Sequence, residues 1–253
     1  ITTNSTGNAV IVTGPLTSDT TYSLVSIIDN SGTMPVCTQT LSGNAVVTVN
    51  SIPVITTVLP NQIVCSDDIV ITNPFVSLPS GATFTWTNTN PAIGLPASGM
   101  GNIPNFTASN TTSLAISATI DVLATSNGCS SSQSFTIIVN PRPFANPIIT
   151  DYALCDYTNP GDGEEVFTLN TKTAEIINGQ VGLTVTYYET ETDAQNQVNP
   201  LPNSYTNTTI GAPQTIWINI RNVTTGCNSV SSFNIVVNPL PVAVTPLPIF
   251  ECS

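Results

Sequence analysis

The chain of 253 residues contains no histidine and only three basic residues, against 15 acidic residues. The resulting net charge of −12 would repel phosphate backbones and anionic lipid head groups. We therefore expect no binding to nucleic acid and no direct insertion into a membrane. Without histidine there is no imidazole for general acid–base catalysis. No apolar run approaches the roughly 18 residues that a membrane-spanning helix needs.

What the sequence does contain is a repeat. Three segments share one order of features: a cysteine, a polar stretch, a β-branched strand, and an Asn followed by a proline-marked joint. A further cysteine follows each joint, and corresponding cysteines recur roughly every 95 residues, which indicates a tandem array. The copies start at Cys37, Cys129 and Cys227, their joints start at Asn50, Asn140 and Asn238, and the cysteines after the joints are Cys65, Cys155 and Cys252.

The repeat and the short β-branched runs predict an all-β chain of tandem β-sandwich modules. Residues 1–50 are expected to be the C-terminal part of a truncated module, with strands at residues 9–12 and 21–27. Residues 51–140 and 141–239 are expected to be complete modules, and 240–253 the start of the next. In the second module, Phe84 and Trp86 lie on one strand face, which predicts a core position for Trp86 beside a disulfide.

The third module is predicted to carry short helical insertions. Residues 171–178 fit two helical turns that end at Gly179. Thr192-Asp193-Ala194-Gln195 fits a capping box that starts one more turn. Strands are expected at residues 183–189 and 215–221.

Two segments resemble known repeats. Residues 86–99, 102–108 and Asn127-Gly128-Cys129 resemble the PKD-like repeat of very large Bacteroidota surface proteins. Residues 185–190, 216–221 and 224–227 resemble a second, immunoglobulin-like repeat of the same proteins. The combination is similar to giant gliding-motility adhesins of the SprB type, which are cargo of the type IX secretion system. This resemblance implies PKD-like and immunoglobulin-like folds, export and display on the cell surface.

The six cysteines recur at the same two places in each repeat, which predicts disulfides and an oxidising compartment. Pairing within each module gives Cys65–Cys129 and Cys155–Cys227, and leaves Cys37 and Cys252 unpaired or joined between molecules. A structural metal site at these cysteines is the rejected alternative, because the sequence has no C-x-x-C and no histidine.

An acidic loop in the third module offers oxygen ligands around two glycines. Hard cations such as Ca²⁺ need several oxygens on a turning backbone, so the loop is a candidate calcium site. A solvated turn is the alternative interpretation, and apart from this possible Ca²⁺ no cofactor is expected. The candidate ligands are Asp156, Asn159, Asp162 and Glu164, with Asp67-Asp68 a weaker candidate pair.

Trp217 is predicted to lie on the polar face of its strand, where a large ring could stack on sugars together with Tyr188. Cover by a short helix or a neighbouring loop is the alternative. Glu189 and Glu191 form a carboxylate pair, but charges that protect an edge strand from aggregation are a commoner explanation for such a pair than catalysis. We therefore predict that the chain is not an enzyme.

The resemblance, supported by the cysteine usage, implies a segment of a secreted, outer-membrane-attached adhesin, acting as stalk and adhesion modules in surface attachment and gliding. The expected partners are an extracellular polysaccharide or solid surface, neighbouring modules of the same chain, and the secretion and motility machinery of the outer membrane. A carbohydrate-binding module is the alternative from another functional class. Proline-marked joints would make the array a semi-rigid rod, because alternating prolines restrict the backbone.

Overall fold

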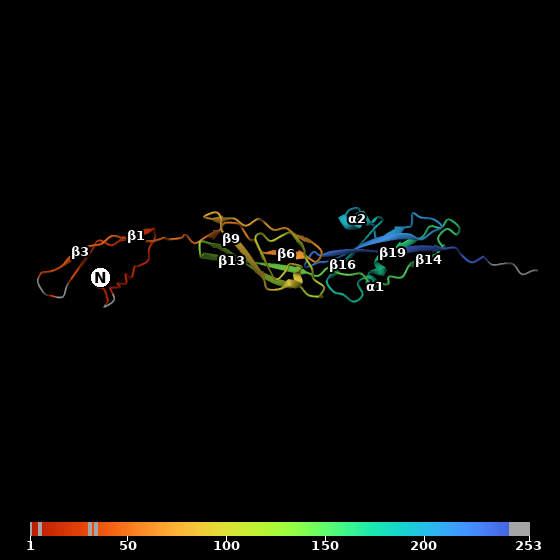
Figure 1. The fold of residues 1–253 in the computed structure, drawn as a ribbon. Helices are drawn as coiled ribbons and strands as arrows, with labels where there is room; N and C mark the ends of the chain where they lie inside the picture. The colour runs from red at the N-terminus through yellow and green to blue at the C-terminus, as the bar shows by residue number, and fades with distance from the viewer. Residues whose placement is uncertain (1, 5–6, 30–31, 33–34, 243–253) are drawn as a thin grey trace, which may run out of the picture.

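The computed structural model describes residues 2–4, 7–29, 32 and 35–242 (Figure 1). The fold is all-β, with two complete immunoglobulin-like sandwiches in tandem and two short α-helices, as the sequence predicts. The two sandwiches lie end to end, and the described residues of the first 50 lie beyond one end of the pair. No helix in the described part of the chain is long and apolar enough to cross a membrane.

The described residues of the first 50 form two small antiparallel pairs, β1 with β4 and β2 with β3, and none of them is buried. The strand predicted over residues 9–12 is wrong, because this segment pairs with no strand among the residues that the structure describes. Val10 and Val12 are accordingly 82% and 90% exposed. The four strands are β1 (Thr20–Ser23), β2 (Ser26–Ile28), β3 (Thr38–Thr40) and β4 (Asn44–Val47).

The second module is a sandwich of one five-stranded sheet, in the order β10-β9-β12-β13-β6, and two small pairs, β5-β8 and β7-β11. Its first long-sheet strand, β6, runs parallel to its last, β13, while the other neighbours are antiparallel. The elements are β5 (Val54–Ile55), β6 (Gln62–Cys65), β7 (Ile69–Val70), β8 (Ser77–Leu78), β9 (Thr83–Asn88), η1 (Pro91–Ile93), β10 (Ser98–Met100), β11 (Phe106–Thr107), β12 (Ile116–Ser126) and β13 (Cys129–Asn140).

The core of the second module follows from the alternation along its long strands. Ala118, Ile120 and Val122 of β12 point inward and are buried, as strand periodicity requires. Trp86 is 4% exposed and belongs to this core, which confirms the predicted burial. Its ring lies against Gly99 of the neighbouring β10 and not against a disulfide: a Cβ at Gly99 would be 2.2 Å from Trp86 Cζ2.

The third module repeats the plan with a four-stranded sheet, in the order β14-β19-β18-β16, and the pair β15-β17. Its first strand, β14, again runs parallel to its last, β19. Its core is separate from that of the second module. The elements are β14 (Tyr152–Cys155), β15 (Val166–Thr168), η2 (Leu169–Lys172), α1 (Thr173–Ile177), β16 (Leu183–Tyr188), α2 (Glu191–Asn196), β17 (Ser204–Thr206), β18 (Gln214–Asn222) and β19 (Asn228–Asn238).

Short helices form close to where the sequence predicts them. The helical turns at 171–178 are present as η2 and α1, and they end at Asn178 and Gly179, both with positive φ. The capping box predicted at Thr192 is displaced by two residues. Thr190 caps α2 instead, because its hydroxyl accepts from Asp193 N at 3.1 Å, whereas Thr192 already lies inside the first turn.

An ion pair between the buried Lys172 and the half-buried Glu175 ties η2 and α1 to the segment before β14. Lys172 is 8% exposed, and its Nζ donates to Thr150 O at 2.7 Å and contacts Glu175 Oε2. Glu175 Oε1 also accepts from Thr150 N. The hydrogen bond from Lys172, followed by the one from the Thr150 backbone, lowers the pKa of the Glu175 carboxyl below its ordinary 4.5.

This lowered pKa predicts an acid-dependent loss of stability in the third module. The contribution of ionised Glu175 is complete above pH 4.5 and is lost as the pH falls through the lower pKa of the folded state. Melting temperatures of the Glu175→Gln variant should therefore fall less steeply with acid than those of the unaltered chain. Glu164→Gln, at an exposed position, is the matched control and should keep the original slope. Equal slopes for the unaltered chain and Glu175→Gln would contradict the account.

Candidate functional site: the joint between the second and third modules

Strand direction decides which cysteines meet. β6 and β13 run parallel and end together, so Cys65 pairs with Asn140 at the end where the chain leaves the second module. Ser66 N extends this pairing by donating to Asn140 O at 2.8 Å. Cys227 lies in the turn that precedes β19, at the end where the chain enters the third module. The two cysteines therefore face each other across the joint.

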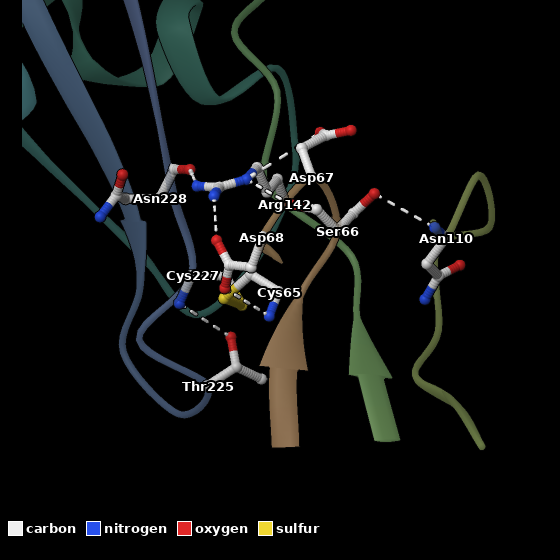
Figure 2. Close-up of polar contacts among 9 residues, drawn as sticks. All are labelled: Cys65, Ser66, Asp67, Asp68, Asn110, Arg142, Thr225, Cys227 and Asn228. Carbon is white, nitrogen blue, oxygen red and sulfur yellow. Dashed lines mark hydrogen bonds and ion pairs between the residues drawn. A yellow bond between two sulfur atoms is a disulfide. The ribbon is translucent and has the colours of Figure 1, made fainter. Parts of the chain in front are cut away.

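Cys65 and Cys227 form a disulfide that links the two modules (Figure 2). Their Cα atoms are 5.7 Å apart, within the usual range for a disulfide, and the bridge spans 162 residues of sequence. Cys227 is only 1% exposed. The joint thus has two covalent connections, the main chain after Asn140 and this bridge.

The predicted pairings Cys65–Cys129 and Cys155–Cys227 are wrong. Cys129 begins β13, whereas Cys65 lies beside its last residue, so the two are separated by about 36 Å of strand. Cys155 likewise lies beside Asn238, the last residue of β19, while Cys227 precedes its first. Disulfides need Cα atoms within about 7 Å, so cysteines at opposite ends of a sandwich cannot pair.

The remaining cysteines carry no bridge in the described part of the chain. Cys37 and Cys155 are exposed, and Cys129 is half-buried. The prediction that Cys37 is unpaired or joined only between molecules stays a prediction. Cys252 lies outside the described residues.

Arg142, in the linker between two prolines, forms a polar layer beside the bridge (Figure 2). Its Nε donates to Ser66 O of the second module and its Nη1 to Asn228 O of the third, both at 2.6 Å. Its Nη2 donates to Asp68 Oδ1 at 2.6 Å. One planar guanidinium therefore contacts both modules, which a lysine ammonium on a single nitrogen cannot do in the same geometry.

Asp68 couples this layer to the disulfide. Its second oxygen, Oδ2, accepts from Cys65 N at 2.9 Å, while Asp67 Oδ2 lies 4.0 Å from Arg142 Nε. The pair Asp67-Asp68, which the sequence offered as a weak cation site, thus faces a protein cation. Sequence reasoning missed this role of Arg142. The available signal was one of only three basic residues placed between two prolines, with an acidic pair that starts two residues after the cysteine of the preceding module.

We expect Arg142→Ala to make the Cys65–Cys227 bridge easier to reduce. The substitution removes three hydrogen bonds that hold the joint closed, one of them to a carboxylate. Because Arg142 is partly exposed, we estimate about 1–2 kcal/mol, or roughly a 5- to 30-fold lower equilibrium constant for closing the bridge.

Reduction of this bridge in a graded dithiothreitol series, followed by thiol alkylation and peptide mapping, measures the effect. Arg142→Lys keeps the charge but should recover only part of the difference. Identical reduction midpoints for the unaltered chain and Arg142→Ala would show that the guanidinium layer does not support the bridge.

The acidic loop after β14 uses its carboxylates to bind its own backbone. Asp156 Oδ2 accepts from Gly161 N at 2.8 Å and Gly163 N at 3.2 Å, and Asp162 Oδ2 accepts from Asn159 Nδ2 at 2.8 Å. Glu164 is exposed. Within the described residues, no group of three or more His, Cys, Asp or Glu side chains could hold a metal ion. Calcium binding at this loop stays a prediction.

The end of this loop is fixed by Glu165, which is buried. It accepts from Thr158 N and from Thr158 Oγ1, both at 2.7 Å. These bonds, the backbone one first, lower the pKa of the Glu165 carboxyl. The loop is thus ordered by carboxylates that point inward to N–H and O–H donors.

The aromatic pair proposed for sugar binding lies beneath α2. Tyr188 and Trp217 are directly opposite each other on β16 and β18, but Tyr188 is only 3% exposed. Asn219, two residues after Trp217, donates through Nδ2 to Ala194 O of α2 at 2.9 Å. Tyr188 therefore presents no ring face to solvent, and Trp217 is half-buried. Glycan binding by Trp217 stays a prediction.

Comparison with protein families bears on the third module. Residues 151–241 match the Flavobacterium inter-domain disulphide bond domain. The match is to a domain named for a Bacteroidota genus and covers about a third of the chain, in agreement with the resemblance found in the sequence. It covers the module that contributes Cys227 to the bridge across the joint. No curated protein matches the chain.

Solved structures similar to this chain include tandem immunoglobulin domains. Titin A164-A165 aligns with a TM-score of 0.28 and 10% identity, covering 74% of this chain and 97% of that one. The titin I-band fragment I67-I69 aligns with a TM-score of 0.37 and 11% identity, covering 80% of this chain and 70% of that one. An endo-fucoidan hydrolase of glycoside hydrolase family 107 aligns with a TM-score of 0.28 and 15% identity, covering 90% of this chain and 35% of the hydrolase. Scores this low carry no functional argument.

Proposed function

We propose that this chain is a non-enzymatic stalk segment of a cell-surface adhesin, built so that tension cannot lengthen it far. The observation that carries the proposal is the Cys65–Cys227 bridge between successive modules. A disulfide inside one module would limit the unravelling of that module alone. A bridge across the joint also fixes how the two modules sit relative to each other.

The covalent path under tension is short. Force applied along the array enters the second module near Ser51 and leaves the third near Pro239. The direct path runs from Ser51 to Cys65, across the bridge, and from Cys227 to Pro239, which is roughly 26 residue steps or about 90 Å when fully extended. The sequence between the two cysteines lies outside this path.

The folded pair is nearly as long as that path. β13 has 12 residues and β19 has 11, so each sandwich is about 40 Å long and two in line measure about 80 Å. Tension would therefore tighten the covalent path before either module could unravel. The prolines of the linker and the hydrogen bonds of Arg142 to both modules also keep the two modules in line.

Three further features of the proposal come from the resemblance to gliding-motility adhesins of the SprB type and from cysteine usage. They are export by the type IX secretion system, display at the outer surface, and attachment to an extracellular polysaccharide or solid surface. The match of residues 151–241 to a Flavobacterium domain supports this setting. Carbohydrate recognition by Trp217 is the second candidate, and loss of binding to a glycan array on Trp217→Ala would favour it.

Small-angle scattering of the full chain tests the stalk role. The oxidised chain should give a narrow distribution of elongated shapes, and the double variant Cys65→Ser/Cys227→Ser a broader one. The matched control, Cys37→Ser/Cys155→Ser, removes two thiols but no bridge and should scatter like the unaltered chain. If the unaltered chain already scatters as a broad mixture, or if cutting the bridge changes nothing, the stalk mechanism is wrong.

A further inference from the structure

A buried glutamine at the start of β18 has its side-chain carbonyl held by two backbone donors. Gln214 is 8% exposed and follows the loop that leads from β17 of the small pair to β18 of the four-stranded sheet. Its Oε1 accepts from Thr208 N at 2.7 Å and from Thr209 N at 3.1 Å. Two N–H groups on one carbonyl oxygen stabilise the negative charge that develops there during acyl transfer.

A hydroxyl lies next to the same carboxamide. Thr208 Oγ1 is 3.1 Å from Gln214 Nε2, the atom bonded to the carbonyl carbon Cδ. A threonine hydroxyl can attack a carbonyl carbon once a base removes its proton. Because nucleophile and acyl group belong to one short loop, their effective concentration far exceeds that of separate molecules.

Tyr205 connects this hydroxyl to a carboxylate. The Tyr205 phenol hydrogen-bonds the Thr208 side chain and donates to Glu189 Oε1 at 2.7 Å. Burial, followed by the hydrogen bond to Glu189, raises the pKa of the phenol, so the phenol stays protonated and can pass a proton on. Glu189 is exposed just after β16 and can accept that proton. The sequence singled out Glu189 only as half of a carboxylate pair with Glu191.

We propose that Thr208 and Gln214 form an intramolecular ester, with release of ammonia. Thr208 Oγ1 bonds to Gln214 Cδ while the hydroxyl proton passes through Tyr205 to Glu189. The N–H groups of Thr208 and Thr209 hold the oxyanion that results. The Cδ–Nε2 bond then breaks, the proton returns through Tyr205 to Nε2, and ammonia leaves to solvent. The step consumes no oxidant, reductant or second substrate.

The corresponding loop of the second module lacks the acyl group. Residues 110–112 and 207–209 share the sequence Asn-Thr-Thr, and each triplet precedes a long strand, β12 or β18. Thr112 Oγ1 hydrogen-bonds Asn110 Oδ1 and Leu114 O, and no glutamine stands between Thr112 and the end of β12. The second module is therefore an internal control in which no ester is expected.

The ester would shorten the connection between the two sheets of the third module. This inference goes beyond the stalk role and does not depend on it, because the groups involved all belong to one module. The ester and the bridge across the joint can therefore fail separately.

The intact mass of the full chain, reduced at neutral pH, tests the ester. The measured mass should lie about 17 Da, one ammonia, below the mass calculated from the sequence. Tandem mass spectrometry should place the loss between Thr208 and Gln214. This location distinguishes the ester from succinimide formation at the Asn-Gly pairs 127–128 and 178–179, which releases the same mass.

Three variants separate the chemistry from the fold. Thr208→Val removes the hydroxyl at nearly constant shape and should restore the full sequence mass, whereas Thr208→Ser should keep the loss. Thr209→Val is the matched control, because Thr209 contacts Gln214 through its backbone N–H, and it should also keep the loss. Glu189→Gln should slow ester formation by about 100-fold or more, followed as mass against time after cell-free synthesis.

Three results would overturn the proposal. The first is a folded, unaltered chain that keeps its full sequence mass. The second is a Thr208→Val variant that still loses ammonia within residues 208–214. The third is a Glu189→Gln variant, with the melting temperature of the unaltered chain, that forms the ester at the unaltered rate.

Discussion

Pulling the reduced chain from its two ends should release about 550 Å more length than pulling the oxidised chain. The Cys65–Cys227 bridge encloses 162 residue steps, and at about 3.4 Å per step this is the length withheld from tension. Optical tweezers with handles at both termini measure the difference directly. The first 50 residues lengthen equally in both states and cancel in the comparison.

Two variants separate the bridge from other effects of reduction. Cys65→Ser/Cys227→Ser should behave under oxidising conditions like the reduced chain, whereas Cys129→Ser should behave like the oxidised one. Equal release of length before and after reduction would mean that the bridge does not carry tension. Release of a single module's length on reduction would instead support a bridge within one module.

Gly99→Ala should destabilise the second module by about 1–3 kcal/mol, a fall in its melting temperature of roughly 4–20 °C. The added Cβ would lie 2.2 Å from Trp86 Cζ2 and 2.5 Å from Cε2, distances that atoms do not tolerate. Trp86 is 4% exposed in a packed core, so its ring has no free space to move into. Differential scanning calorimetry of the oxidised chain measures the change.

Gly14→Ala is the matched control, because no atom lies within 4 Å of its added Cβ and its φ is not in the left-handed region. Its melting profile should match that of the unaltered chain. A Gly99→Ala variant as stable as the unaltered chain would contradict the placement of the Trp86 ring over β10.

Local pattern predicted the strands and helical turns well, since alternation at Ile120 and Val122 and the glycine stop at Gly179 are properties of neighbouring residues. Local pattern failed where a strand forms only if a segment distant in the sequence pairs with it. The segment around Val10 has strand-forming residues but no neighbour to pair with, and so it forms no strand.

The cysteine pairings failed for a related reason. Periodicity showed that Cys65 and Cys129 belong to one module, but not at which end of it each lies. That depends on the parallel pairing of β6 with β13, which joins residues far apart in sequence. Once that pairing is known, the distance along β13 excludes the bridge within the module.

Stiffness of the joint was predicted from prolines alone, and the structure shows additional causes. Replacing residues 140–143 with Gly-Ser-Gly-Ser would remove two prolines and Arg142 but leave Cys65–Cys227 intact. We therefore expect that replacement to loosen the joint much less than the same replacement combined with Cys227→Ser. The bridge, and not the linker, is the principal restraint in this account.

The most direct test of the account is the disulfide map of the full oxidised chain. Digestion without reduction, after free thiols have been alkylated at low pH, followed by mass spectrometry, should recover a peptide pair joined through Cys65 and Cys227. Cys37 and Cys155 should be recovered alkylated. Recovery of Cys65 joined to Cys129, or of Cys155 joined to Cys227, would contradict the bridge across the joint and the function proposed from it.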